Sequence, residues 1–266
     1  MRHLGYELSS PSPSKARDGS ISQAPETRPR QRVPQSRAVT TAKRIVKFLV
    51  PKRVLQEVAQ YRKYKRAERP LYLKIRVLDG LGQHNKRAPE TLAAAHSFLF
   101  VCSGNIMRSP MCEALMRQEL AALPHTRVTV ASAGLNASPG KLAHPWGLAS
   151  AAQLGVSLEP HRATLLTLDM VNKADVIFAM DYHNQVELLC RYPGARERIF
   201  MLSAYAGNDY HSVEIRDPFY GDEEETMRCY RILQTCIRNL VSHLPSRMPQ
   251  PDPQTAPRER GNKVSQ

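Results

Sequence analysis

Long apolar runs and paired cysteines are both missing from this 266-residue sequence. No run of about 18 apolar residues occurs, so no membrane-spanning helix is expected. The five cysteines are odd in number and form no Cys-x-x-Cys pair, which indicates reduced thiols in a cytoplasmic protein. The N-terminus lacks the apolar core of a secretory signal. A transit peptide is the second choice there, because Glu7, Asp18 and Glu26 interrupt its acid-poor pattern.

Acidic residues are scarce in the first hundred positions. Residues 1–100 carry 21 lysines and arginines against 7 aspartates and glutamates, whereas residues 101–266 carry 17 of each. The formal net charge of +14 therefore belongs wholly to the N-terminal part. Residues 1–40 are also poor in large apolar residues and rich in Ser, Pro, Gln and Arg, so we expect them to be disordered.

Residues 41–67 combine basic residues with apolar residues at helical spacing, and Pro51 fits the first turn of a second helix. This pattern suits peripheral contact with an anionic membrane, such as the inner face of the cell membrane, or a partner groove. A solvated helix that packs on the rest of the protein is an equally good interpretation. Nucleic acid is disfavoured, because no recognised binding motif accompanies the basic residues. Further on, residues 71–78 alternate apolar and polar side chains, as a half-buried strand would.

From Ser97 onward, strand and helix patterns alternate, which predicts a parallel α/β sheet covered on both faces. We expect strands at 97–102, 127–131, 175–180 and 198–202, with a turn at 132–134 after the second. Helices are expected near 109–122, 143–155, 182–191 and 223–243. The predicted organisation is a disordered segment 1–40, a basic amphipathic extension 41–95, a catalytic domain 96–244 and a flexible Pro-rich tail 245–266.

The segment after the first predicted strand carries the chemistry. A helix N-terminus and a nearby cation activate a thiol as a nucleophile, and the same N–H groups bind a phosphate dianion. Cys102 at the strand end and Arg108 at the helix start fit this arrangement, because the guanidinium can clamp two phosphate oxygens. A buried structural cysteine is the alternative. The full run is Val101-Cys102-Ser103-Gly104-Asn105-Ile106-Met107-Arg108-Ser109-Pro110.

Expelling an oxygen leaving group from phosphorus needs a proton donor. Asp217 is the best candidate, because Pro218 restricts it to extended conformations. Phe219 and Tyr220 could form the aromatic walls of a slot for a flat ring. An Asp-Pro pair is by itself more typical of a turn; its occurrence together with the cysteine loop favours the catalytic interpretation.

These motifs, together with Ser132-Ala133-Gly134-Leu135 and His161-Arg162-Ala163, resemble the low-molecular-weight protein tyrosine phosphatases of the bacterial type over about residues 97–244. The resemblance implies a four-stranded parallel sheet of flavodoxin-like appearance, with helices on both faces and the site at the carboxyl end of the first strand. It implies hydrolysis of phosphotyrosine in a protein substrate, such as a bacterial tyrosine kinase. No metal and no cofactor is implied, because the arginine and the helix dipole neutralise the transferring group.

The resemblance also implies residue roles. Cys102 would form a phosphocysteine, Arg108 would clamp the phosphoryl oxygens, and Asp217 would protonate the leaving tyrosine and then help to activate water. Ser109 would hydrogen-bond the thiolate, and Asn105 would hold the strained loop turn. His161 and Asp181 match supporting positions, although a purely structural role is at least as good an interpretation. The phosphate-binding residues would be Ser103, Gly104, Asn105, Ile106, Met107 and Ser109.

The sequence departs from the family pattern at two places. Met107 stands where relatives often carry a second cysteine, so we hypothesise that Cys102 lacks a disulfide protector and is open to overoxidation. Full recovery of peroxide-treated enzyme by dithiothreitol would contradict this. Cys112 is expected to be a packing residue. Before Pro145, His144 replaces an acidic residue, and Trp146 either borders the substrate slot or packs on the domain.

Three other functions compete with phosphotyrosine hydrolysis. Phosphoarginine phosphatases resemble this loop but carry a small polar residue at the position of Ile106, whose apolar side chain suits an aromatic ring better. Arsenate reduction is disfavoured, because it needs relay cysteines and only Cys190 lies in the middle of the domain. A catalytically silent phospho-binding scaffold is disfavoured by the intact trio Cys102, Arg108 and Asp217.

Overall fold

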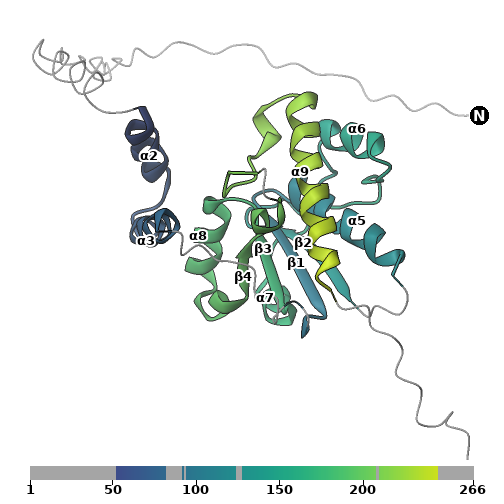
Figure 1. Ribbon diagram of the computed structural model, residues 1–266, viewed down its shortest axis with the longest axis horizontal. Coiled ribbons are helices and arrows are strands. Elements are labelled where there is room, and N and C mark those ends of the chain that lie inside the picture. The colour runs from purple at the N-terminus through teal and green to yellow at the C-terminus, as the bar shows by residue number, and fades with distance from the viewer. Residues whose placement is uncertain (1–51, 82–91, 93, 124–127, 208–209, 245–266) are drawn as a thin grey trace, which may run out of the picture. The chain divides into compact units, whose positions relative to one another are not determined.

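Four short strands form one parallel sheet with the strand order β2-β1-β3-β4. The computed structural model describes residues 52–81, 92, 94–123, 128–207 and 210–244 (Figure 1). The strands are β1 (Ser97–Cys102), β2 (Thr129–Gly134), β3 (Val176–Ala179) and β4 (Ile199–Met201). The predicted four-stranded parallel sheet with helices on both faces is therefore confirmed.

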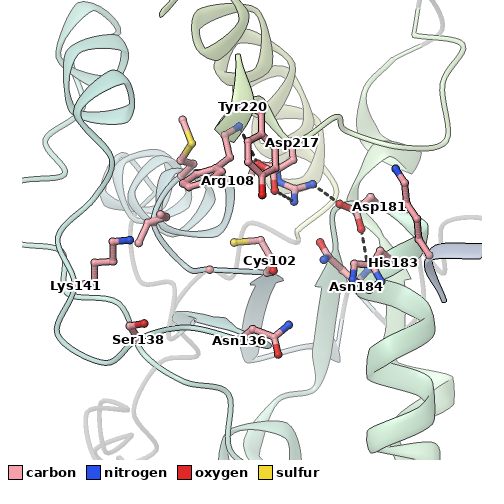
Figure 2. A pocket seen from close by; sticks show the side chains of 16 residues that line it. Cys102, Arg108, Asn136, Ser138, Lys141, Asp181, His183, Asn184, Asp217 and Tyr220 are labelled. Atoms are coloured by element: carbon pink, nitrogen blue, oxygen red, sulfur yellow. Dashed lines mark hydrogen bonds and ion pairs between the residues drawn. The ribbon is translucent and has the colours of Figure 1, made fainter. Parts of the chain in front are cut away.

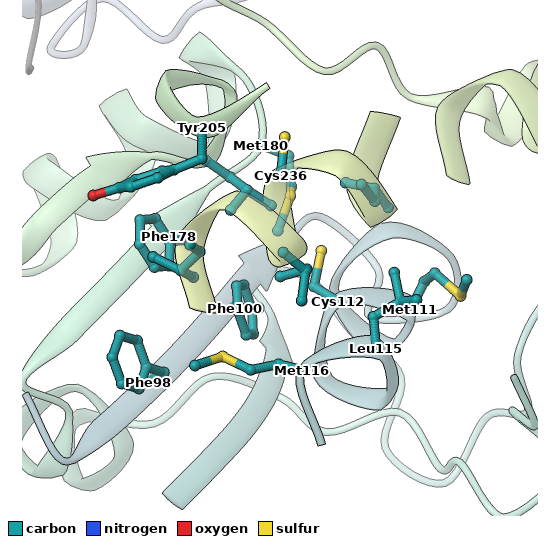
Figure 3. Packing of buried hydrophobic residues seen from close by; sticks show 14 of the residues in the cluster. Phe98, Phe100, Met111, Cys112, Leu115, Met116, Phe178, Met180, Tyr205 and Cys236 are labelled. Carbon is teal, nitrogen blue, oxygen red and sulfur yellow. The ribbon is translucent and has the colours of Figure 1, made fainter. Parts of the chain in front are cut away.

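Alternation along β1 divides the core between the two faces of the sheet. Phe98 and Phe100 pack against α5 (Arg108–Ala121) and α9 (Glu223–Ser242), as Figure 3 shows for part of this cluster. Leu99 and Val101 pack on the other face with residues of α7 (Leu168–Lys173) and α8 (Tyr182–Arg191). The helix α6 (Pro145–Gln153) lies against α9. Burial of the strand on both faces explains why β1 is apolar after its first residue, Ser97.

The observed elements correct the expected boundaries at β2. This strand begins at Thr129 and runs through Ser132, Ala133 and Gly134, where a turn was expected. These three residues pair with Phe100, Val101 and Cys102 of β1. Their side chains are small because the end of β2 lies against the loop that follows Cys102: a Cβ at Gly134 would approach the Ser103 carbonyl oxygen to 2.7 Å. Small residues that resemble a turn in the sequence are here required by close packing.

The expected strand at 71–78 is wrong, because these residues belong to a helix, α3 (Arg69–Gly80). Leu71 and Ile75 share one helical face and pack inward, whereas Leu73 and Val77 are 48% and 61% exposed. Alternation of apolar residues was compatible with both structures over so short a run. Pro70 lies in the first turn, where proline favours a helix start.

The helix expected after Pro51 is present as α2 (Lys52–Lys63), and residues 41–51 of the basic segment lie outside the described residues. Tyr64, just beyond α2, is buried and stacks on Tyr72 of α3 with 4.3 Å between ring centroids. Tyr72 in turn meets Tyr182 of α8 edge-on. Arg76 donates a hydrogen bond to the Tyr182 hydroxyl at 3.0 Å. We call α2 and α3 the N-terminal helix pair.

Candidate active site

The loop that contains the predicted nucleophile lies where the sheet order reverses. β1 has β2 on one side and β3 on the other, and residues 103–107 connect the carboxyl end of β1 to the start of α5. Crevices at such a reversal are the usual ligand sites of open α/β sheets. The first turn of α5 adds backbone N–H groups that have no partner within the helix. The fold thus places the N-terminus of α5, which can bind an anion, beside Cys102.

Asn105 holds the loop in a strained conformation. It is the one non-glycine residue with positive φ, at 51°, in the described part of the chain, and it is fully buried. Its side-chain nitrogen Nδ2 donates to Ser109 Oγ and Ser132 Oγ, both at 2.9 Å, and its Oδ1 accepts from the Thr164 backbone N–H at 2.7 Å. His161 Nε2 lies 2.7 Å from the Asn105 carbonyl oxygen. These contacts offset the cost of the left-handed backbone.

The Cys102 sulfur receives two hydrogen-bonding groups from the loop. Ser109 Oγ lies 3.0 Å from Sγ, and the backbone N–H of Asn105 donates to Sγ at 3.3 Å. Both contacts hold the sulfur in place at the end of β1. Figure 2 shows the sulfur at the floor of a cavity, below Arg108 and Asp217.

Arg108 is 1% exposed, and its side chain is fixed by acceptors from two other loops. Its terminal nitrogens donate to Asp181 Oδ2 and Asp217 Oδ2, each at 2.6 Å, and to the Ile215 carbonyl oxygen at 2.9 Å. Burial alone lowers the pKa of Arg108, but the two carboxylates outweigh it and raise this pKa above its usual value. The guanidinium therefore stays charged beside the cysteine, and Asp217 is brought to the same place (Figure 2).

A cavity of about 480 Å³ opens above Cys102, and most of the predicted site residues line it. Asn105 and Ser109 do not line it; they lie behind the loop, fully buried, and support it. Phe219 and Tyr220 are at the exposed rim, with their rings 4.9 Å apart edge-to-face. The predicted residues that line the cavity are Cys102, Ser103, Gly104, Ile106, Met107, Arg108, Asp217, Phe219 and Tyr220.

Several lining residues were not predicted from the sequence. Asn184 is 1% exposed, and neither polar atom of its side-chain amide has a hydrogen-bond partner among the described residues. Asp181 caps the start of α8 by accepting from the Asn184 backbone N–H at 2.7 Å, a bond that does not depend on the residue type at position 184, so no sequence signal marked the Asn184 side chain. Lys63 had no local signal, because α2 is far from the loop in the sequence. The others are Asn136, Ser138, Lys141 and His183.

The two departures from the family pattern have clear structural settings. Met107 is buried and packs with Ile106, and all five cysteines are free thiols. Cys112 is fully buried in α5, and burial raises the pKa of its thiol well above the usual value, as expected of a packing residue. His144 caps α6 by accepting from the Trp146 backbone N–H at 3.3 Å, which is the task an acidic residue could perform. Trp146 is half-exposed and does not line the cavity above Cys102.

No group of three or more His, Cys, Asp or Glu side chains in the described residues is arranged to hold a metal ion. Across the same part of the chain, no helix has both the length and the apolar character that crossing a membrane requires.

Comparison with known proteins matches residues 97–249 to the family described as low molecular weight phosphotyrosine protein phosphatase. A probable low molecular weight protein-tyrosine-phosphatase, EpsP of Ralstonia solanacearum, is 39% identical over 46% of this chain and 78% of its own length. The protein-arginine-phosphatase of Bacillus subtilis is 30% identical over 55% of this chain and 95% of its own length. The crystal structure of the Erwinia amylovora tyrosine phosphatase AmsI has a TM-score of 0.51 at 30% identity, covering 56% of this chain and 93% of that one.

A cysteine loop at the reversal of a four-stranded parallel sheet, opposed by a buried arginine, defines the class as a phosphoric monoester hydrolase with a cysteine nucleophile. The family match covers more than half of the chain. The chain therefore belongs to the low molecular weight phosphotyrosine protein phosphatases.

Proposed function

We propose that this chain hydrolyses phosphotyrosine in protein substrates through a phosphocysteine intermediate. One observation carries the proposal: Cys102, Arg108 and Asp217 all line the same cavity. Phosphoryl transfer to sulfur needs a nucleophile, a charge clamp and a proton donor in reach of one phosphate.

In the first step the Cys102 thiolate attacks phosphorus, and the bond from phosphorus to the tyrosine oxygen breaks. Arg108 and the N–H groups at the start of α5 bind the equatorial oxygens, whose charge grows in the transition state. Arg108 is paired with Asp217 here, so an arriving phosphate competes for the same donors. The protonated Asp217 then donates to the departing tyrosine oxygen.

In the second step water attacks the phosphocysteine, and the bond between sulfur and phosphorus breaks. Asp217, now ionised, accepts a proton from the attacking water, so the acid of one step is the base of the next. The sulfur leaves as a thiolate and regains the hydrogen bonds from Ser109 and from the Asn105 N–H. Inorganic phosphate is released, which restores the starting state.

The side chains around the cavity support an aromatic substrate over a guanidinium. Ile106 offers an apolar surface in the loop, and Phe219 and Tyr220 add aromatic surface at the rim. The Bacillus subtilis relative named as an arginine phosphatase makes phosphoarginine the second candidate. Turnover of matched phosphotyrosine and phosphoarginine peptides separates the two. Faster turnover of phosphoarginine would overturn the assignment of substrate while leaving the cysteine chemistry intact.

The decisive experiment for the chemistry is turnover of p-nitrophenyl phosphate by Cys102→Ser and by Cys190→Ser. Cys190 is an exposed cysteine of α8 that lines neither the cavity above Cys102 nor the loop, so it is the matched control. We expect loss of turnover in Cys102→Ser with retained phosphate binding, and little change in the control. A low rate that is equal in all three proteins would support a phospho-binding scaffold instead.

The partner and location of the enzyme are further parts of this proposal. We infer a cytoplasmic phosphotyrosine protein as substrate, for example a tyrosine kinase, and contact of residues 41–67 with the inner face of the membrane. Exposed Val54 and Val58 beside the basic residues of α2 support such a contact. Sedimentation of the full chain with anionic and with uncharged vesicles tests it. Equal sedimentation with both would exclude the electrostatic contact.

A further inference from the structure

A second cavity, of about 540 Å³, adjoins the catalytic one. The two cavities share four lining residues, so they are neighbouring parts of one depression. The end of α2 and the residue after it supply part of the lining of the second cavity, and the segment that carries Asp217 supplies another part. The shared residues are Lys63, Asp181, His183 and Asp217, and the α2 side adds Gln60 and Tyr64.

The α2 wall lies outside the family match, which begins only at residue 97. Tyr64 anchors this wall: it is 6% exposed, stacks on Tyr72 of α3, and meets the His183 ring edge-on at 5.6 Å. The neighbouring Lys63 is exposed and reaches both cavities. The extension thus places a lysine directly beside the site of phosphate chemistry.

Three carboxylates and two exposed cations line the second cavity. The carboxylates are held within the protein: Asp181 and Asp217 both bond to Arg108, and Glu214 accepts from the Tyr182 backbone N–H at 3.0 Å. By contrast, Lys63 and Arg216 are exposed and have no ion pair within the described part of the chain. A ligand that enters here meets two cations that are free to bind it.

We propose that the second cavity is a substrate subsite for an acidic side chain close to the phosphotyrosine, with Lys63 and Arg216 as its donors. The inference rests on the proposed phosphotyrosine hydrolysis and adds a rule for which substrates are preferred. An extended peptide advances about 3.3–3.6 Å per residue. Since the cavities share walls, the acidic residue lies within about three positions of the phosphotyrosine.

The test compares full-length Lys63→Glu with full-length Lys74→Glu. Lys74 is an exposed lysine of the neighbouring α3 that lines neither cavity, so the control makes the same charge change outside the subsite. The substrates are p-nitrophenyl phosphate and phosphotyrosine peptides with Glu, Ala or Lys at each of three positions on either side. kcat/KM for each peptide is divided by kcat/KM for p-nitrophenyl phosphate with the same protein.

We expect the normal protein and Lys74→Glu to prefer a Glu-containing peptide over its Lys-containing match by about fivefold or more at one or more positions. In Lys63→Glu this preference disappears or reverses toward the Lys-containing peptide. A reversed preference is a gain in relative activity toward the Lys-containing peptide, which a misfolded variant could not produce.

Equal ratios for Glu, Ala and Lys peptides at all six positions in the normal protein would overturn the subsite. So would a Glu preference that survives in Lys63→Glu. In both cases the normal protein and Lys74→Glu still turn over p-nitrophenyl phosphate, so these results differ from failure of the phosphatase assignment itself. That failure would show as a low rate with every substrate that is unchanged in Cys102→Ser.

Discussion

The phosphate-binding loop and the N-terminal helix pair are held in opposite ways. In the loop and the first turn of α5, Asn105, Arg108 and Ser109 are buried, and their polar atoms bond to β2, to Asp181 just before α8 and to neighbouring loops. In the helix pair, Arg76 and Glu57 form an ion pair whose side chains remain 31% and 47% exposed. One region is fixed by buried hydrogen bonds, and the other by stacked tyrosines and a partly solvated ion pair.

This difference sets the expected free energies. Breaking a buried hydrogen bond leaves an unsatisfied group at a cost of about 1–3 kcal/mol, whereas an exposed ion pair contributes about 0–1 kcal/mol. The loop should therefore move only when the whole domain unfolds, while the helix pair can open locally. The rigid catalytic site and the more weakly attached helix pair, which contributes to the proposed substrate subsite, can then change independently of each other.

The largest effect is expected for Arg108→Lys. A lysine keeps the charge but loses the planar pair of donors that meets Asp181 and Asp217. We expect kcat for p-nitrophenyl phosphate to fall by about 10²–10³-fold, as when one preorganised donor is removed from a transition state. Arg117→Lys, an exposed position of the same helix, is the control and should retain its kcat. A loss of kcat of tenfold or less in Arg108→Lys would mean that a point charge at this position suffices for catalysis.

The same substitution, glycine to alanine, can be made beside the loop and in the helix pair, which compares how tightly the two regions are packed. At Gly134 of β2 a Cβ would lie 2.7 Å from the Ser103 carbonyl oxygen and 2.8 Å from the Asn105 nitrogen, so Gly134→Ala must displace the loop backbone. We expect about 1–3 kcal/mol lower unfolding free energy together with a reduced kcat. At Gly80, the last residue of α3, nothing lies within 4 Å, and Gly80→Ala should be neutral or slightly stabilising. Chemical denaturation and turnover of p-nitrophenyl phosphate measure both, and equal effects would contradict the comparison.

A smaller and more local effect is expected for Arg76→Met. Arg76 bonds to Glu57 of α2 and to the Tyr182 hydroxyl of α8, so the variant loses contacts on both sides of α3. We expect amide hydrogen exchange over residues 54–80 to speed up by about tenfold. Exchange in β1 and β3 should be unchanged. Arg66→Met, at an exposed position between the two helices, is the matched control. Faster exchange throughout the domain would show that the helix pair is part of the core.

Arg76→Met also links the helix pair to the proposed subsite. If Lys63 acts from α2, loosening this helix should reduce the preference for acidic peptides. An unchanged preference alongside faster exchange would assign the selectivity to Arg216 alone.

The sheet and the loop were predictable because their signals are local. Apolar runs of strand length mark β1 and β3, and a cysteine followed six positions later by an arginine marks the phosphate-binding loop. α3 was mistaken for a strand because Leu71, Leu73 and Ile75 satisfy an alternation of two. Only tertiary packing shows that Leu73 faces solvent. The end of β2 was mistaken for a turn because Gly134 is required by a neighbour that is distant in the sequence.

The parts of the site that could not be predicted come from long-range contacts. Lys63 lies 39 residues before Cys102 and reaches the cavity only because Tyr64 packs between α3 and α8. Asn184 lies in the first turn of α8, where asparagine is a common residue. Nothing in the sequence around it indicates a buried side-chain amide that lines the cavity. Such residues belong to the site through packing and carry no motif of their own.

The smallest effect concerns Asp175, at the end of the sheet opposite Cys102. Its Oδ2 accepts from the backbone N–H groups of His96 and Ser97 at 2.8 and 3.0 Å, and these bonds, the His96 one foremost, lower the pKa of Asp175. Because the pKa is lower in the folded state, the stabilisation is present at neutral pH and is lost as the pH falls through the folded pKa. Asp175→Asn should therefore lower the unfolding free energy at pH 7 by less than about 1 kcal/mol, since Asp175 is exposed. The difference from the normal protein should shrink toward acid, whereas a difference that is constant from pH 7 to pH 3 would assign the effect to the shape of the side chain.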